Sequence, residues 1–452
     1  MALPRPQAPF SGIARWLLPV AAALAVGCAE ERASPRPRSL TIAFTNDMQG
    51  EIRSCGCASK DQGGLGRRAT FLEAVRDTAG DFLLLEGGGF FSSKLSYGKE
   101  KADLTIKAMA LIGYDAVALG ADEFGFGVDY IVERTRELGL PVLAANVSDG
   151  QADTLLFPPA RELELPSGLR VGIIGLTSDK AILPPQVPPG RVRILDPVAA
   201  ARTHAAALSA VDVLMVVANM TRPEVMRLAA AVPSIDVIAF GSEARAMRNV
   251  RPKGGAYLLQ TAAKGRYVGV AHAALGPDNR IRSLQVQMGE LDQEYPDHET
   301  MSRLFEAYDM NIAFKERGEQ PPGAYEALQG VKRPFAGAET CRPCHEAIQA
   351  QWGATAHAHA FETLVAKQRQ LDRDCVPCHT TGFYERGGYE SPDLTPDLAG
   401  VQCESCHGNS REHVQTPALR TPGEARAKCR ACHTVDQTPD FAFETFWARI
   451  RH

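Results

Sequence analysis

Eight of the eleven cysteines fall between residues 341 and 432, in four C-x-x-C-H motifs. This motif is typical of c-type haem attachment, because two thiols bond the porphyrin and the following histidine ligates the iron. Zinc held by paired C-x-x-C units is the alternative, but four motifs that all end in histidine favour haem. We therefore predict four covalent haems, with thioether bonds from Cys341, Cys344, Cys375, Cys378, Cys403, Cys406, Cys429 and Cys432, and proximal ligation by His345, His379, His407 and His433.

The segment that carries these motifs, residues 336–452, has little apolar side-chain volume of its own. Its stretches between motifs are rich in Gly, Pro and Thr. A short chain of this kind cannot build a sufficient hydrophobic core, and bound macrocycles supply the missing apolar mass. We expect a small, mainly helical or irregular tetrahaem cytochrome c domain that is unfolded without haem.

The sixth ligand of each iron separates an electron carrier from a haem enzyme. Outside the motifs, this segment has four further histidines, which permits bis-histidine ligation of every iron. The stretches W-G-A-T-A-H-A-H-A (352–360), C-E-S-C-H-G-N-S-R-E-H (403–413) and F-W-A-R-I-R-H (446–452) resemble the cytochrome c-554 family of multihaem cytochromes. The resemblance implies distal ligation by His357, His413 and His452. His359 has no counterpart in that family, so it is either a distal ligand or an exposed residue. In the second case one iron lacks a histidine as its sixth ligand.

The first thirty residues are typical of an export signal. Arg5 and Arg15 precede or flank an apolar run at 16–26, which is too short to span a bilayer. The run ends in L-A-V-G-C at 24–28, which resembles a bacterial lipoprotein signal. We expect residues 1–27 to be removed, Cys28 to be lipidated, and residues 28–38 to form a linker. Plain cleavage near Gly27, with Cys28 free, is the alternative.

Residues 39–287 alternate β-branched-rich apolar runs with helical periodicity, which predicts an α/β layered domain. The predicted strands are 40–44, 82–85, 116–119, 142–145, 171–176, 211–217, 237–240, 256–260, 267–273 and 281–288, and the predicted helices are 68–77, 102–112, 128–138, 197–208 and 223–231. A polar helix at 299–315 and the Q-P-P-G sequence at 320–323 follow. We divide this part into a domain at 39–290 and a helical connector and linker at 291–335.

Short sequences along this domain follow the order seen in the 5′-nucleotidase branch of the calcineurin-like metallophosphoesterases. They are T-N-D-M-Q-G (45–50), G-G-L-G-R-R (63–68), L-L-L-E-G-G-G-F (83–90), 118–127, A-A-N-V (144–147) and G-I-I-G-L-T (172–177). The resemblance implies a two-sheet α/β sandwich with a dinuclear metal site at the strand ends, where two metals clamp a phosphate and generate the nucleophile.

Most of the metal ligands that this resemblance implies are replaced. The family's Asp-x-His reads Asp47-Met-Gln, its Asp-x-Gly-Asp reads E-G-G-G at 86–89, and its Gly-Asn-His-Glu reads G-A-D-E at 120–123. A loop histidine is replaced at or near Asn219, and the closing Gly-His-x-His reads G-S-E-A at 241–244. Asp47 is the one usual ligand that persists, and one carboxylate does not hold two metals. We therefore do not expect a dinuclear metal.

Three groups of residues in this domain are weaker candidates for a functional site. An unusual set of Asp47, Glu86, Asp122 and Glu243 could bind one metal, but solvated loop acids are the simpler interpretation, and Asn146 and His204 are interpreted as ordinary polar residues. Cys55 and Cys57 are open between a strained C-x-C disulfide, a metal or iron contact, and free thiols.

We predict a periplasm-facing, membrane-anchored electron carrier whose partners are redox proteins, with an outer-membrane rather than inner-membrane anchor. The 49 basic and 53 acidic residues give no sign of nucleic-acid binding. The phosphoesterase-like domain is expected to serve docking. The alternatives are a haem-site redox enzyme acting on a small nitrogen or sulfur compound, a residual phosphohydrolase, and a ligand-binding sensor domain.

Overall fold

The computed structural model describes residues 38–54, 61–92, 98–242, 255–318, 333–367, 369–372, 375–418, 425–434, 437–438 and 440–452. The chain divides into two units, 1–37 and 38–452. The predicted signal segment, Cys28, Cys55, Cys57, Glu243 and the Q-P-P-G sequence lie outside the described residues. None of the described helices is long and apolar enough to cross a membrane.

The first five-stranded sheet has the order β12-β11-β1-β2-β3. The central strand β1 pairs parallel with β2 and antiparallel with β11, and β11 pairs antiparallel with β12. Apart from its first residue, β1 is buried along its length, as expected for a strand covered on both faces. The strand bounds are β1 Ser39–Thr45, β2 Asp81–Glu86, β3 Ala116–Val117, β11 Tyr267–Leu275 and β12 Ile281–Glu290.

The second five-stranded sheet has the order β10-β9-β8-β6-β5, in which only the β5–β6 pair is antiparallel. A two-stranded sheet of β4 and β7 lies beside these two. The bounds are β4 Val147–Asp149, β5 Ala160–Glu164, β6 Arg170–Thr177, β7 Val192–Ile194, β8 Val213–Asn219, β9 Val237–Gly241 and β10 Tyr257–Leu259.

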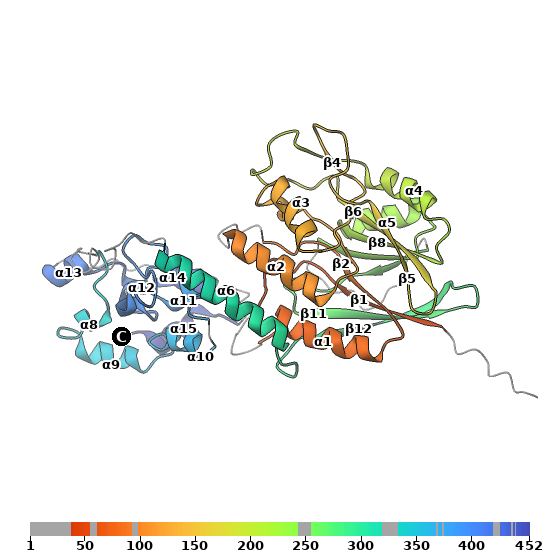
Figure 1. Ribbon diagram of the computed structural model, residues 1–452. Helices are drawn as coiled ribbons and strands as arrows, with labels where there is room; N and C mark the ends of the chain where they lie inside the picture. The colour runs from red at the N-terminus through yellow and green to blue at the C-terminus, as the bar shows by residue number, and fades with distance from the viewer. Residues whose placement is uncertain are drawn as a thin grey trace, which may run out of the picture. The chain divides into compact units, whose positions relative to one another are not determined.

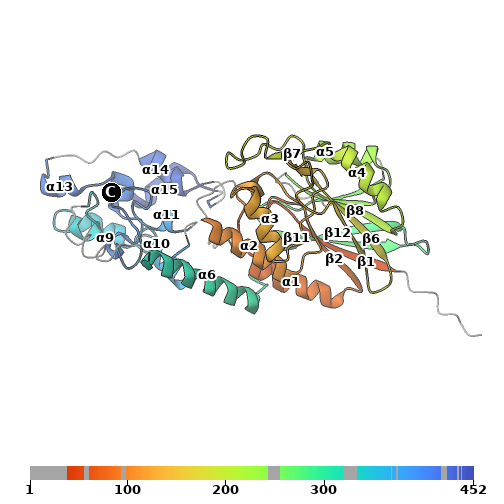
Figure 2. The ribbon, with the colours of Figure 1, turned by 45° about the horizontal axis from the view of Figure 1, so that its top comes forward.

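Helices cover the outer faces of the two sheets, so the domain has four layers (Figure 1). One apolar cluster lies between the sheets and joins residues such as Ile42 and Leu83 to Ile173 and Val217. Two further clusters lie under α1 and α2 on one side and under α4 and α5 on the other. Figure 2 shows these two helix layers on opposite sides of the sheets. The helix bounds are α1 Leu65–Thr78, α2 Gly98–Ile112, η2 Asp122–Phe124, α3 Val128–Glu137, α4 Pro197–Ala207, α5 Arg222–Ala231 and α6 Glu299–Gly318.

Local sequence signals explain where several of these helices begin. The α5 helix opens with a capping box, because the Glu224 carboxylate accepts hydrogen bonds from the backbone and the hydroxyl of Thr221. The α1 helix follows Gly64, which has a positive φ of 96°. A Cβ at Gly64 would lie 2.7 Å from the Ser54 nitrogen, so this turn requires glycine.

The predicted strand at 142–145 is wrong. Val142 makes only a single bridge to Val117, and the next strand, β4, begins at Val147. The apolar run is buried because it passes directly over β6: a Cβ at Gly175 would lie 2.0 Å from the Leu143 carbonyl oxygen. Residues 142–145 are therefore apolar because they are buried, although they do not pair as a strand of either sheet. The short strands β5 and β7 carry little apolar pattern and were not predicted.

The C-terminal part consists of short helices of at most eight residues among those described. Their one buried cluster is small and is formed by Phe335, Leu364, Val376, Tyr389 and Leu398. The predicted mainly helical, core-poor character is therefore present. The bounds are α8 Ala338–Cys341, α9 Glu346–Gly353, α10 Ala360–Ala366, α11 Val376–His379, η3 Pro396–Leu398, α12 Cys403–His407, α13 Arg411–Gln415, α14 Ala425–Cys432 and α15 Phe443–Ile450.

Candidate functional sites

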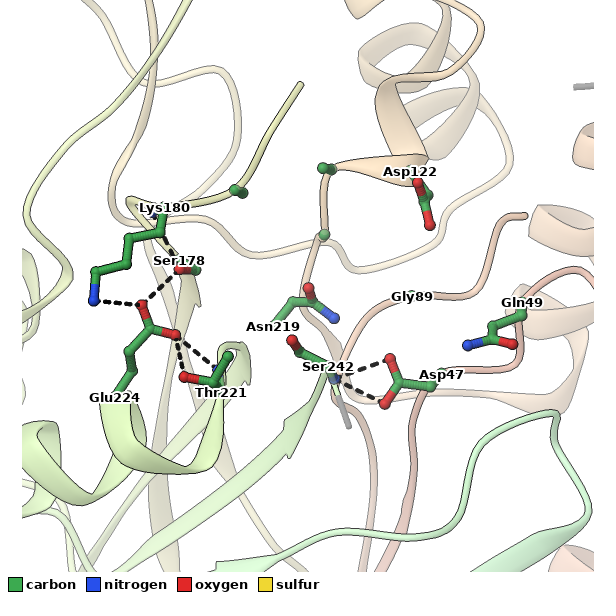
Figure 3. A pocket seen from close by; sticks show the side chains of 13 residues that line it. Asp47, Gln49, Gly89, Asp122, Ser178, Lys180, Asn219, Thr221, Glu224 and Ser242 are labelled. Atoms are coloured by element: carbon green, nitrogen blue, oxygen red, sulfur yellow. Dashed lines mark hydrogen bonds and ion pairs between the residues drawn. The ribbon is translucent and has the colours of Figure 1, made fainter. Parts of the chain in front are cut away.

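A cleft of about 420 Å³ lies at the carboxyl ends of strands from both large sheets (Figure 3). This is the position where open α/β sheets bind ligands. Asp47 follows β1, Ser178 follows β6, Asn219 ends β8 and Ser242 follows β9. The lining residues that the sequence analysis did not single out are Ser178, Lys180, Ala181, Thr221 and Glu224, which lie within a few residues of the ends of β6 and β8.

The Asp47 carboxylate is turned toward the protein backbone. Both of its oxygens accept hydrogen bonds from the Ser242 amide, at 2.9 and 2.8 Å, and Oδ2 also accepts one from the Asn46 side chain at 2.8 Å (Figure 3). Only 6% of Asp47 is exposed. The one persisting ligand position is therefore used to hold the loop after β9.

The position of the family's bridging carboxylate is closed by packing. Gly89 stands there with a positive φ of 75°, and a Cβ at this residue would lie 2.6 Å from Asp47 Oδ1. A Cβ at the neighbouring Gly120 would lie 2.7 Å from Asn219 Oδ1. A longer side chain cannot enter at either glycine unless its surroundings move.

Two further acids of this region, Glu86 and Glu123, are fully buried. Thr45 donates a hydrogen bond to Glu86 at 2.5 Å, and the Phe91 and Gly120 amides donate to Glu123 at 2.8 and 2.6 Å. Burial raises the pKa of Glu86 to about 8 and that of Glu123 to about 7. These carboxyl groups bond the protein interior rather than the cleft.

Asp122 is half-buried at the cleft wall, and burial raises its pKa. Across the cleft, the Glu224 carboxylate accepts a hydrogen bond from Ser178 at 2.8 Å and lies 3.8 Å from the Lys180 ammonium (Figure 3). Within the described residues, no three His, Cys, Asp or Glu side chains are grouped so that they could hold a metal ion. Asn146 lies elsewhere, where it bonds the Thr177 and Leu195 backbone.

In the C-terminal part, six of the predicted haem-ligating histidines lie in three pairs. The ring centres are 6.2 Å apart for His345 and His413, 6.1 Å for His357 and His433, and 5.7 Å for His407 and His452. Each pair joins one motif histidine to one of the histidines that the cytochrome c-554 resemblance marked as distal. The sequence did not predict which motif each distal candidate would meet.

The fourth motif histidine, His379, is different. Its Nδ1 donates to the Ala360 carbonyl at 2.6 Å, which directs Nε2 away from the protein backbone. Within the described part of the chain, no second imidazole lies against it. His359 is more than half exposed, and its two ring nitrogens lie 3.0 Å from Glu362 and 3.0 Å from the Gly353 carbonyl.

The surroundings of the paired histidines favour the neutral imidazole that an iron requires. Burial lowers the pKa of His357, His407 and His433, and the neighbouring histidine adds to this for His357 and His407.

The attachment cysteines of different motifs also lie side by side. Cys403 raises the pKa of the Cys341 thiol and Cys432 lowers that of Cys378, so the two side chains of each pair are neighbours. Porphyrins attached through the first and third motifs would therefore be neighbours, as would those attached through the second and fourth.

Buried polar side chains take the place of a large core in this part. Glu404, inside the third motif, is 2% exposed and accepts hydrogen bonds from the amides of Ala336, Gly337 and Ser410 at 2.7–3.0 Å. Gln402 accepts from the Ala338 amide at 2.6 Å. These contacts fasten the start of the domain to the third motif. No sequence pattern marked either residue in advance.

The clustered attachment motifs and paired histidines define a c-type cytochrome domain. Residues 340–408 match the family described as cytochrome c554 and c-prime, which confirms the predicted family of this domain. Cytochrome c-554 of Nitrosomonas europaea is 35% identical over 135 residues, which are 22% of this chain and 57% of that protein. The chain thus spans little more than half the length of this relative.

The N-terminal domain has the 5′-nucleotidase and metallophosphoesterase fold, as predicted. The 5′-nucleotidase of Vibrio parahaemolyticus is 30% identical over 161 residues, which cover 34% of this chain and 28% of that protein. The structure of a 5′-nucleotidase precursor from Thermus thermophilus superposes with a TM-score of 0.52 at 22% identity, over 61% of this chain and 59% of that one. At that identity the likeness establishes the fold alone.

Proposed function

We propose that this protein is an exported tetrahaem c-type cytochrome that transfers electrons between redox partner proteins, with a phosphoesterase-like domain that serves docking rather than hydrolysis. The observation that carries the proposal is the pairing of six histidine rings at 5.7–6.2 Å. A cytochrome c554 domain implies electron transfer, and the pairing bears on how many irons are closed to other ligands.

The spacing of the pairs fits an iron between the rings. Two imidazoles on opposite sides of one metal ion have ring centres about 6 Å apart, because each metal–nitrogen bond is about 2 Å and each nitrogen lies roughly 1 Å from its ring centre. On this basis His345 and His413 hold the first haem, His407 and His452 the third, and His433 and His357 the fourth. When bound, haem supplies a one-electron couple.

The neighbouring cysteines support short transfer distances. Because Cys341 neighbours Cys403 and Cys378 neighbours Cys432, haems attached there would be close in two pairs, the first with the third and the second with the fourth. Burial raises the pKa of the Cys406 thiol and Cys429 adds to this, which supports proximity of the third and fourth attachment sites. We infer that electrons pass in the order first, third, fourth, second or the reverse.

The docking role of the N-terminal domain rests on the closed metal site. Asp47 is bound by the Ser242 amide, and Gly89 leaves no room for the bridging carboxylate. Among the described residues that line the cleft, a bound phosphate would also face the acids Asp47, Asp122 and Glu224, with Lys180 as the one basic side chain to offset their charge. We therefore propose that this fold is retained for a surface or a ligand and not for hydrolysis.

Export and anchoring form the last part of the proposal. Attachment of c-type haem is characteristic of exported proteins, and the signal-like start of the sequence agrees with this. We propose that Cys28 carries the lipid and fixes the chain to the periplasmic side of the outer membrane. Mass spectrometry of the mature N-terminal peptide tests this; a free Cys28 thiol would refute the anchor.

The experiment that tests the main proposal is a haem count on the mature protein, combined with low-temperature electron paramagnetic resonance. A pyridine haemochrome assay should give four haems per chain that acid–acetone does not extract. Three should be low-spin, as expected for bis-histidine ligation. Fewer than four covalent haems, or a mostly high-spin spectrum, would refute it.

A second candidate function is favoured by one observation, the absence of a partner ring at His379 among the described residues. The second haem would then be five-coordinate and could bind a small nitrogen or sulfur compound, which makes a haem-site redox enzyme the alternative. Carbon monoxide or nitric oxide should bind one haem in four. If no haem binds either ligand in the reduced protein, this alternative fails.

A further inference from the structure

The His433 imidazole is contacted by two aromatic rings and by a hydroxyl group. The ring of Phe441 lies parallel to it, at 4.8 Å between centres and 7° between planes. Phe446 meets it edge-on at 5.6 Å and packs on Phe441 at 5.0 Å. The hydroxyl of Thr438 lies 3.1 Å from His433 Nδ1. The ring is thus held on one face, at one edge and at one nitrogen.

These contacts leave the remaining ring nitrogen for the iron. With Nε2 on the metal, Nδ1 carries the proton and donates it to the Thr438 hydroxyl, which fixes the tautomer. Offset parallel stacking at this distance is favourable, and it resists rotation of the imidazole about the bond to the metal. His357 lies on the other side of the pair, with its ring inclined by 52° to His433.

The contrast with His379 is informative. Its Nδ1 donates to the Ala360 carbonyl at the shorter distance of 2.6 Å, with the Thr363 hydroxyl farther off at 3.3 Å, and no aromatic ring is stacked on it within the described residues. A carbonyl is a stronger acceptor than a hydroxyl, and a stronger acceptor makes the imidazole a more basic ligand. The second and fourth haems, which the cysteine contacts make neighbours, would thus have proximal ligands of different basicity.

We propose that Phe441 and Thr438 are positioning residues that set the orientation and basicity of the His433 ligand, and through them the spectrum and reduction potential of the fourth haem. This inference rests on the proposed function, since it requires a haem at the fourth motif. Phe441 also covers one face of the ring, and both burial and hydrogen bonding around a ligand tune haem potential.

The test compares single substitutions in the full-length holoprotein. Phe441→Leu removes the stacked ring but keeps apolar volume, and Phe441→Tyr keeps the ring. Thr438→Val removes the hydrogen-bond acceptor at nearly constant size. Phe443→Leu is the matched control, since Phe443 lies on the neighbouring helix and stacks on Trp447 at 5.7 Å instead of on a motif histidine. The readouts are haem count, low-spin g values and a potentiometric titration.

We expect Phe441→Leu and Thr438→Val to retain four haems and to shift the g values and the midpoint potential of one haem, the same one in both. Phe441→Tyr should keep the wild-type g values, and Phe443→Leu should change neither readout. If both main variants leave all g values and potentials unchanged, or if the control moves them equally, the inference is overturned. A wild-type protein without low-spin haems would instead refute the proposed function itself.

Discussion

Glu404 provides a sharp test of how the cytochrome domain is held together. Its buried carboxylate receives three backbone amides from two segments, residues 336–337 and Ser410. Glu404→Ala would leave these amides in a buried space without an acceptor. Glu404→Gln keeps the shape but turns an N–H group toward at least one of the amides.

The magnitude follows from the number of amides. Each buried donor left without an acceptor costs about 1–3 kcal/mol. With three amides affected, Glu404→Ala should therefore destabilise the domain by about 3–9 kcal/mol, a large part of the roughly 5–15 kcal/mol that stabilises a typical domain. Glu404→Gln, which retains one carbonyl acceptor, should cost about half as much.

The assay is denaturant unfolding followed by the haem Soret band, since the haems report on this domain and not on the α/β domain. Glu412→Gln is the control, because Glu412 is an exposed acid in the short helix α13. We expect the denaturant concentration at the unfolding midpoint to fall in the order Glu412→Gln, Glu404→Gln, Glu404→Ala, with the control equal to wild type. Equal midpoints for all variants would refute the idea that buried polar contacts substitute for a core here.

Three further predictions follow from other parts of the molecule. Burial raises the pKa of Glu86 to about 8, against about 4.3 in the unfolded chain. The contribution of Glu86 to stability is therefore complete below pH 4 and is lost as the pH rises toward 8. Glu86→Gln should flatten the fall in melting temperature of the α/β domain between pH 5 and 8, and an unchanged slope would contradict this. Deletion of His452, which lies 5.7 Å from His407, should convert one low-spin haem to high-spin and open it to carbon monoxide, and unchanged spectra would show that it is not a ligand. The wild type should not release phosphate from nucleotides with added manganese. Gly89→Asp should not restore this activity, because a side chain at Gly89 meets Asp47. Turnover that Asp47→Ala abolishes would show that the site is active.

The sequence predicted the α/β domain well because its central strands, such as β1, β6 and β8, are buried along most of their length and helices alternate with them. Nearly every predicted strand has its counterpart, from β1 to β12, within a few residues. The exception at 142–145 shows the limit of a pattern based on burial. A segment that passes over a sheet is as apolar as a segment that pairs within it.

The candidate sites were predicted unevenly for a physical reason. Covalent haem attachment requires a fixed local motif, so Cys341 and its counterparts can be found from spacing alone. A distal ligand such as His413 comes from elsewhere in the chain, and only the fold decides which motif it meets. Phe441, Thr438 and Glu404 act through packing and hydrogen bonds, which leave no local pattern in the sequence.

The histidine pairs also bear on how the cytochrome domain matures. They span 345–413, 357–433 and 407–452, so each interval overlaps the next and none closes independently of the others. An iron in each pair would act as a cross-link between distant segments, and such interlocked cross-links form cooperatively with folding. The segment that carries His452 must then be in place before the third haem is complete, and haem insertion at the first motif cannot by itself produce a finished domain. Maturation would thus be all-or-none rather than stepwise from the N-terminal side.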